Sequence, residues 1–155
     1  MPHIHKDIDF TVSAAIVFNG KILLVDHPRY GVWLTPGGHV ELTEDTDQAL
    51  LREIREETGL QENDIEVVSE RVDPDDAGKA KPLWVPRWMN IHPANPPHRH
   101  IDLMYLVRAK TDRIALDRAE HNDIRWFGDE ELQDAKLPMF ADNRWYAREA
   151  IRLLS

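Results

Sequence analysis

The sequence predicts one mixed domain, of the α/β or α+β class, in which a β-sheet packs against α-helices. Strand-like segments come first, a long helical segment interrupts them, and a second helical segment closes the chain after more strands. Such an order is typical of a sheet with helices packed on it. The length of 155 residues fits a single domain over 1–155, and an apolar content of 42% suits a globular protein.

Composition and charge exclude several classes of protein. The formal net charge of −9 opposes broad contact with the phosphate backbone of DNA or long RNA, but it does not oppose binding of a small nucleotide. No apolar stretch approaches the length of a membrane span, and the first residues lack the apolar core of a signal peptide. The chain has no cysteine, which excludes disulfides and thiolate metal sites. We therefore expect a cytoplasmic protein with no membrane partner.

The first part of the chain is typical of a β-hairpin followed by a glycine turn. An apolar run over 11–18 predicts a buried strand, and Asn19-Gly20 predicts a tight turn into a second strand over 21–26. A loop and a short strand over 27–34 lead to Gly37-Gly38. Adjacent glycines let the backbone approach another group closely.

The central helical segment carries three glutamates on one flank. Asp45 is a good N-cap, and Gly59 stands where a helix commonly ends in the left-handed conformation. Between them Glu53, Glu56 and Glu57 are spaced so that their carboxylates share one side. Crowded carboxylates repel one another, and a hard divalent cation such as Mg²⁺ would reverse that effect. A solvated acidic face is the alternative interpretation.

The second half predicts more strands and a closing helix. Strands are expected over 65–69, 83–91, 101–107 and 120–127, and a helix with an apolar stripe over 139–154. Pro86 would demote the second of these strands to an edge or a bulge, with Trp84 and Trp88 on one face and Arg87 on the other. A mobile loop is expected over 73–81, and three prolines make 92–100 a stiff loop.

Three polar side chains follow at alternate positions where this stiff loop enters a strand. Extended geometry would place His98, His100 and Asp102 on a common face. Imidazole and carboxylate groups suit zinc or manganese, so a second metal site is one interpretation. A wall of the substrate pocket, or histidines that merely cap the loop, are the others.

Around the central helix the chain follows the pattern Gly38-x5-Glu44-x7-Arg52-Glu53-Ile54-x-Glu56-Glu57-x-Gly59-Leu60. This pattern resembles the motif of the Nudix (MutT-like) hydrolases without a departure. The resemblance implies the Nudix fold, a mixed sheet sandwiched between helices. It also implies Mg²⁺-dependent cleavage of the diphosphate linkage in a nucleoside diphosphate derivative, with Mn²⁺ as an alternative ion.

The resemblance also assigns roles within the motif. It implies direct metal ligands at Glu53 and Glu57, a direct or water-mediated one at Glu56, and a backbone carbonyl from Gly37 or Gly38. Two further residues, Glu44 and Arg52, are expected to orient this cluster. The general base is expected to be Glu53 or Glu56, with Glu120, before the late strand, as the alternative.

Substrate selectivity must come from outside the motif. A base could stack on one of three tryptophans, namely Trp33, Trp84 and Trp88, although a large buried aromatic is more often core. A terminal phosphate could be held by Arg29, Arg87 or Arg99. We expect a nucleoside triphosphate, intact or oxidised, cleaved to the monophosphate and pyrophosphate. A nucleotide sugar or a dinucleoside polyphosphate is the alternative substrate, and a homodimer is compatible with the family.

Two other functions are compatible with the same resemblance. One is a nucleotide-binding regulatory module without turnover, against which the intact set of carboxylates counts. The other is a different enzyme on the same fold, such as isopentenyl diphosphate isomerase. The familiar isomerases rely on a cysteine, and this chain has none.

Overall fold

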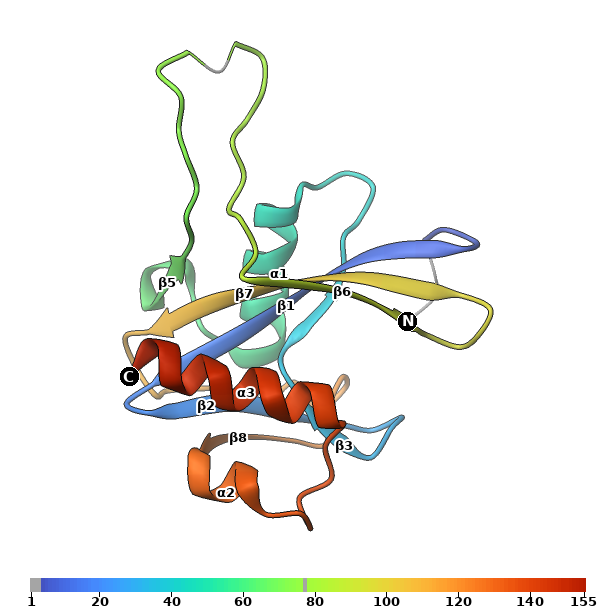
Figure 1. Ribbon diagram of the computed structural model, residues 1–155, viewed down its shortest axis with the longest axis vertical. Coiled ribbons are helices and arrows are strands. Elements are labelled where there is room, and N and C mark those ends of the chain that lie inside the picture. Colours follow the sequence, from blue (N-terminus) through green and yellow to red (C-terminus); the bar gives the residue numbers. More distant parts are fainter. Residues whose placement is uncertain (1–3, 77) are drawn as a thin grey trace.

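The computed structural model describes residues 4–76 and 78–155. Within these residues eight strands form one mixed sheet with the central order β3-β2-β1-β7-β5 (Figure 1). The strands are β1 (Ile8–Phe18), β2 (Lys21–His27), β3 (Val32–Leu34), β4 (Gly37–His39), β5 (Ile65–Val68), β6 (Trp88–Pro93), β7 (Arg99–Ala109) and β8 (Asp123–Gly128). The helices are α1 (Thr46–Thr58), the short 3₁₀ turn η1 (Glu62–Asp64), α2 (Asp129–Gln133) and α3 (Ala141–Leu154). The predicted mixed fold is confirmed.

The centre of the sheet is the parallel pair of β1 and β7, which runs in register from Ile8 opposite Arg99 to Val17 opposite Arg108. On its other edge β1 pairs with β2 near its end and with β4 near its beginning. The predicted hairpin turn is confirmed, because Asn19 and Gly20 have φ angles of 47° and 73°. Two positive φ angles match the right-handed twist of the flanking strands.

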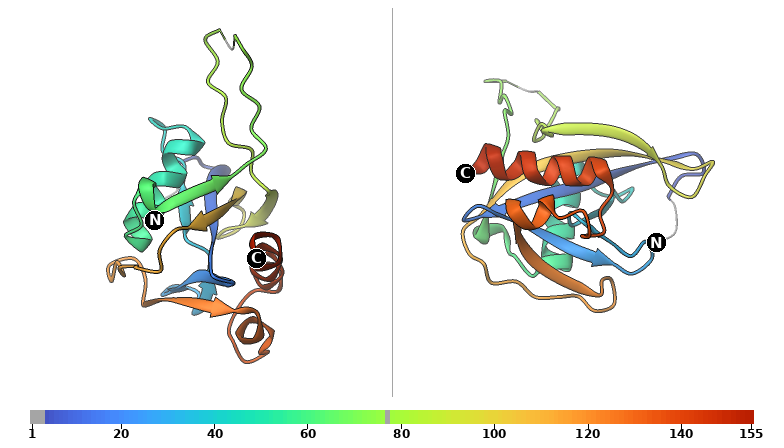
Figure 2. Two further views of the ribbon diagram at one scale, coloured as in Figure 1. Left: turned by 90° about the vertical axis from the view of Figure 1, so that its left-hand side faces the viewer. Right: turned by 60° about the horizontal axis from the view of Figure 1, so that its bottom comes forward.

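Helices cover the two faces of this sheet, as the views of Figure 2 show. The side chains of β1 alternate between the faces. One apolar cluster joins Val12 and Ile16 to Leu50 and Ile54 of α1. The other joins Ala15 and Val17 to α3, where Ala147, Ala150 and Ile151 are buried. Because β1 contributes to both clusters, it lies between the two helices.

The segment before β6 differs from the predicted strand over 83–91. Regular pairing with β7 begins only at Trp88, because Pro86 has no N–H to donate to a neighbouring strand. The expectation that Trp84 and Trp88 share one face is wrong. Trp84 packs against the α1 cluster, whereas Trp88 packs against the α3 cluster. The chain crosses the sheet edge between them.

Three other features of the secondary structure differ from the prediction. Gly37 and Gly38 belong to β4, paired with β1, rather than to a turn. His92 and Pro93 extend β6, so the loop expected over 92–100 is shorter. The short helix α2 was not predicted, because its acidic residues carry little apolar signal and only Leu132 is buried.

A long excursion connects β5 to β6 and projects from the domain as an extended arm (Figure 1). The described residues between these strands form no regular helix or strand, in agreement with the loop expected over 73–81. Among the described residues, helices are too short or too polar to cross a bilayer.

Candidate active site

Helix α1 begins and ends where its capping residues require. The Asp45 side chain accepts the backbone N–H of Gln48, and the Gln48 side chain accepts the N–H of Asp45, which completes a capping box. Gly59 ends the helix at a φ of 77°, as predicted. These caps fix where α1 begins and ends, and the packing of Leu50 and Ile54 in the core sets which flank carries its glutamates.

The three glutamates of α1 divide into a buried pair and an exposed member. Glu53 and Glu57 are 3% and 4% exposed, whereas the Glu56 side chain is 51% exposed. Burial raises the pKa of Glu53, and the Glu57 carboxylate beside it raises the pKa further, although Arg52 opposes both effects. A cation placed beside two carboxylates that are this buried and this close would favour their charged forms.

Strand β4 forms the other wall of the site. The N–H of Gly37 donates to Oε2 of Glu57 at 3.3 Å. A Cβ on Gly38 would lie 2.3 Å from Oε1 of Glu53, so only glycine leaves this carboxylate in place. The glycine backbone therefore contacts both buried carboxylates. This is the close approach that the sequence indicated for Gly37-Gly38.

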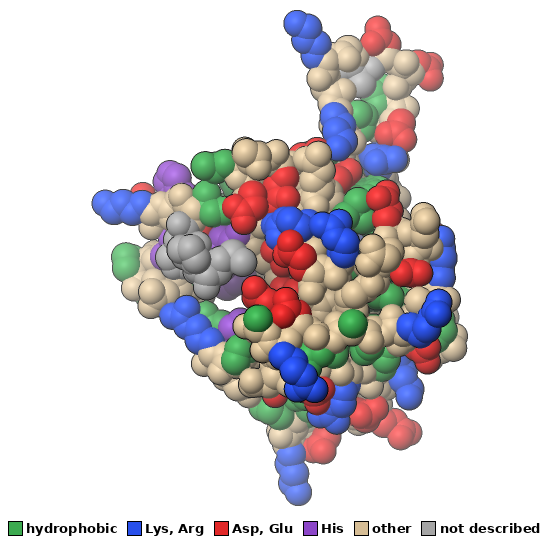
Figure 3. All heavy atoms as spheres, turned by 180° about the vertical axis from the view of Figure 1, so that it is seen from behind, with side chains coloured by type: hydrophobic (Ala, Val, Ile, Leu, Met, Phe, Trp, Pro, Cys, Tyr) green, Lys and Arg blue, Asp and Glu red, His purple; other side chains and the backbone are tan. Residues whose placement is uncertain are grey.

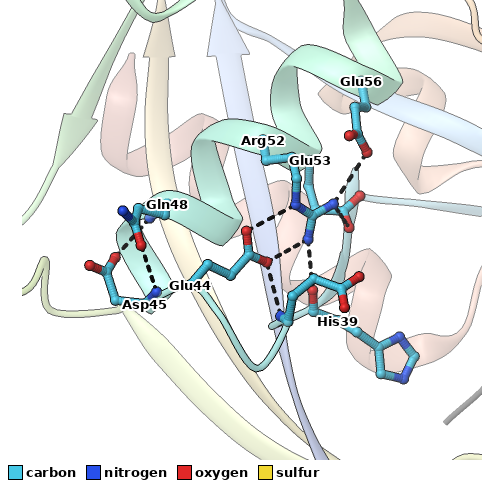
Figure 4. Close-up of polar contacts among 8 residues, drawn as sticks. His39, Glu44, Asp45, Gln48, Arg52, Glu53 and Glu56 are labelled. Atoms are coloured by element: carbon cyan, nitrogen blue, oxygen red, sulfur yellow. Dashed lines mark hydrogen bonds and ion pairs between the residues drawn. The ribbon is translucent and has the colours of Figure 1, made fainter. Parts of the chain in front are cut away.

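Arg52 connects the parts of the site, as Figure 4 shows. Its guanidinium forms a two-pronged contact with Glu44, with Nε–Oε2 at 3.0 Å and Nη2–Oε1 at 2.7 Å. The same group donates to Oε1 of Glu53 at 2.8 Å and to Oε2 of Glu56 at 3.2 Å. It also reaches the backbone carbonyl of His39 at 2.9 Å. Arg52 thus ties α1 to β4 and to the loop that carries Glu44.

A histidine that was not singled out from the sequence also contacts the carboxylate pair. His121 is buried, and its Nε2 lies 3.0 Å from Oε2 of Glu57. Burial lowers the pKa of His121, but the hydrogen bond and the charge of Glu57 outweigh burial and raise it. The neighbouring Glu120 is exposed in a turn. The sequence contained no signal for His121, because this contact joins residues far apart in the chain.

The candidate substrate residues lie in different environments. Trp33 is 5% exposed and meets Phe127 edge-to-face at 4.8 Å, which leaves little surface on which a base could stack. Trp84 is half-buried at the base of the arm, with the Arg71 guanidinium 5.9 Å from its ring centre. Trp88 is half-buried against the aromatic rings of α3. Three exposed arginines lie on separate segments, namely Arg29 in the loop after β2, Arg87 before β6 and Arg99 at the start of β7.

The polar residues of β7 do not form the group that their spacing indicated. Asp102 is buried and accepts hydrogen bonds from Thr11 at 2.7 Å and from Ser13 at 2.9 Å. His98 and His100 instead group with Asp9 of β1. Asp9 was not predicted, since pairing of β1 with β7 is what brings it there.

Seen from behind, the surface of the domain carries acidic side chains gathered next to basic ones, with histidine side chains to one side of them (Figure 3). Paired carboxylates, a glycine strand and an arginine clamp are groups that could hold a divalent cation and an anionic substrate.

Comparison with known proteins agrees with this geometry. A model of the NUDIX domain matches residues 9–149. The CTP pyrophosphohydrolase of Escherichia coli is 46% identical over 54 residues, which cover 32% of this chain and 40% of that protein. The uncharacterised Nudix hydrolase YvcI of Bacillus subtilis is 48% identical over 40 residues, or 26% and 25% of the two chains. The matches thus span less than half the length of these curated relatives.

Solved structures extend the likeness over nearly the whole chain. A NUDIX-family hydrolase from Clostridium perfringens has a TM-score of 0.82 at 28% identity, covering 95% of this chain and 98% of that one. The E. coli dihydroneopterin triphosphate pyrophosphohydrolase has a TM-score of 0.64 at 16% identity, covering 96% and 97%, and shows the shared fold alone.

The fold and the site thus define a Nudix-type domain. Since the family model spans most of the sequence, this chain belongs to the Nudix hydrolase family.

Proposed function

We propose that this protein is a Mg²⁺-dependent pyrophosphohydrolase of small nucleotides. The supporting observation is the buried pair Glu53 and Glu57 held against the backbone of Gly37 and Gly38. Burying two carboxylates side by side is costly unless a cation compensates them. The donor atoms are all oxygens, which suits Mg²⁺, and Mn²⁺ as a second choice.

In this proposal Glu53, Glu57 and the half-exposed Glu56 hold the ion, together with a backbone carbonyl of the Gly37-Gly38 strand. When bound, such an ion neutralises phosphate oxygens and lowers the pKa of water. Arg52 keeps the glutamates oriented through its contacts with Glu44 and Glu53. His121 restrains Glu57 through its contact with Oε2.

The reaction needs a base that removes a proton from the attacking water. The water oxygen bonds to phosphorus, the P–O bond to the leaving phosphate breaks, and the base accepts the proton. Glu53 or Glu56 is the first choice for this base, since both lie in the Arg52 cluster. Glu120 is the alternative, because it precedes the His121 that contacts Glu57.

A nucleoside triphosphate is the favoured substrate. The names of two similar proteins support it, one a CTP pyrophosphohydrolase and the other a probable DHNTP pyrophosphohydrolase. Another similar protein is named ADP-ribose pyrophosphatase, so nucleotide sugars belong in the same test, together with the dinucleoside polyphosphates expected from the sequence. Trp84 and Trp88 keep partly exposed rings on which a base could stack, whereas Trp33 is buried in the core.

A hydrolysis screen with Mg²⁺ tests the proposal. The panel contains intact and 8-oxo nucleoside triphosphates, nucleotide sugars and dinucleoside polyphosphates, with released phosphate and pyrophosphate as the readout. We expect one class to dominate, and turnover to be nearly abolished in Glu57→Gln with the fold unchanged by circular dichroism. Full activity in this variant would refute the metal site.

The variant Glu120→Ala tests the base separately. A loss in kcat of less than about 10-fold would place the base among the glutamates of α1, because general-base catalysis is worth about 10²–10⁴. No turnover across the panel, with nucleotide binding detected by thermal shift, would instead support the non-catalytic binding module.

A further inference from the structure

A second group of potential metal ligands lies at the beginning of β1 and β7. It consists of Asp9, His39, His98 and His100, and we call it the histidine cluster. Asp9 is opposite His100 in the β1–β7 register, and His39 is opposite Thr11 in the β1–β4 register. Because residues 9 and 11 of a strand point to the same face, these registers bring the side chains of three strands together. His98 completes the cluster from the turn that precedes β7.

The nitrogens converge on one carboxylate. Nε2 of His39 lies 3.1 Å from Oδ2 of Asp9, and Nε2 of His98 lies 3.3 Å from the same oxygen. Asp9, His98 and His100 each offer a ligand atom within 4.8 Å of the others. Around a tetrahedral zinc ion with bonds of about 2.0–2.1 Å, neighbouring ligand atoms lie about 3.3 Å apart. The separations of 3.1 Å and 3.3 Å match this spacing.

The groups around the cluster fix the direction of these ligands. Nδ1 of His98 lies 3.0 Å from the backbone carbonyl of Lys6, which can only accept, so this nitrogen carries the proton. Nε2 is then the atom that faces Asp9. A carbonyl partner on the second ring nitrogen is the usual arrangement for a metal-bound histidine. Backbone N–H groups of Ile4 and His5 likewise hold the Asp9 carboxylate.

The imidazole rings of the cluster also lie close together. The His100 ring lies 4.8 Å from that of His39 and 5.3 Å from that of His98.

We propose that Asp9, His39, His98 and His100 bind one divalent transition-metal ion of the zinc class. This site is separate from the glutamate site in its ligands and its chemistry. Imidazole nitrogen suits zinc, whereas Mg²⁺ requires oxygen ligands. The ion would join β1, β4 and β7, and it would hold His39, whose neighbour Gly38 lies against Glu53. Its role is therefore to brace the strand that forms one wall of the glutamate site.

Zinc binding to the full chain is the direct test. Protein treated with chelator and freed of it by gel filtration is dialysed against Zn²⁺ in excess Mg²⁺, and bound zinc is counted by plasma mass spectrometry. We expect one zinc per chain. His98→Ala and His100→Ala should each weaken zinc binding at least about 100-fold, since even loss of an indirect partner costs about 10–100-fold. Co²⁺ substitution should give visible absorption bands typical of a four-coordinate site.

Two control variants make the test specific. His92 is a neighbouring histidine whose Nδ1 lies 2.7 Å from Oδ1 of Asn90, so His92→Ala should keep full zinc binding. Glu57→Gln should also keep it, because Glu57 belongs to the other site. Asp9→Asn, nearly equal in volume, provides a further ligand variant if an alanine variant fails to fold.

Three outcomes would overturn the proposal. They are a zinc stoichiometry near zero at micromolar zinc, unchanged binding in His98→Ala, His100→Ala and Asp9→Asn, or loss of zinc in Glu57→Gln. None of these measurements depends on turnover, so the histidine cluster and the hydrolase activity are tested independently.

Discussion

Replacing Gly38 with alanine tests whether the Glu53 carboxylate must stay where it lies. The new Cβ would be 2.3 Å from Oε1 and 2.6 Å from Cδ of Glu53, whereas ordinary contacts begin at 3.4 Å. The carboxylate would therefore have to move by about 1 Å. A displacement of that size at a catalytic group lowers the rate about 100-fold, which is about 2.7 kcal/mol of transition-state stabilisation.

The same substitution should hardly change the stability of the fold. The displaced atoms are the end of a flexible side chain, and a Gly→Ala change gains about 0.4–1 kcal/mol by restricting the unfolded chain. Gly37→Ala is the matched control. Its Cβ would lie 2.1 Å from the backbone oxygen of Val12, so β4 and β1 would have to separate. We expect that variant to lose about 1–3 kcal/mol of unfolding free energy.

Two measurements distinguish these variants. The first is kcat/KM on the best substrate of the screen, and the second is urea unfolding. The Mg²⁺-induced rise in Tm gives a readout that is independent of turnover and should shrink in Gly38→Ala. If Gly38→Ala kept kcat/KM within a factor of about three, or lost as much stability as Gly37→Ala, the reasoning about Glu53 would be refuted.

Two further predictions concern stability. The Arg144 guanidinium donates to three backbone carbonyls, one in α2 and two in the segment between α2 and α3. Arg144→Met should cost about 2 kcal/mol of unfolding free energy, and Arg148→Met, at a surface ion pair, should cost little; equal effects in urea unfolding would contradict this. Burial raises the pKa of Asp47 above 3.8, and the N–H of Trp84 partly opposes this effect. The contribution of Asp47 to the stability of the fold is therefore complete below pH 3.8, and it is lost as the pH rises through the raised pKa. Relative to the native chain, Asp47→Asn should therefore gain stability as the pH rises from about 4 to 7, and a pH-independent difference would contradict the assignment.

The sequence predicted the parts of the fold and site that depend on local signals. Short stretches of sequence specify the caps Asp45 and Gly59, the Asn19-Gly20 turn and the central helix. The structure confirms all of them. The family pattern likewise lies within 23 residues, so Glu53 and Glu57 could be found without coordinates.

The contacts that the sequence did not reveal depend on how distant segments of the chain come together. Asp9 meets His98 and His100 because β1 and β7 run parallel in one register, and no local pattern specifies that register. His121 reaches Glu57 from the segment before β8. Trp84 and Trp88 looked like neighbours on one strand, and only the irregular path around Pro86 separates them.

Strand β4 makes two chemically different sites depend on one register. Opposite β1, Gly38 faces Glu53 on one side of the sheet, and His39 faces Asp9 on the other. A slip of one residue reverses the direction of every side chain in a strand. Such a slip would push an imidazole into the carboxylates and remove a nitrogen from the histidine cluster. An insertion or deletion between Pro36 and Glu44 would thus damage both sites at once, whereas point substitutions can change either site alone.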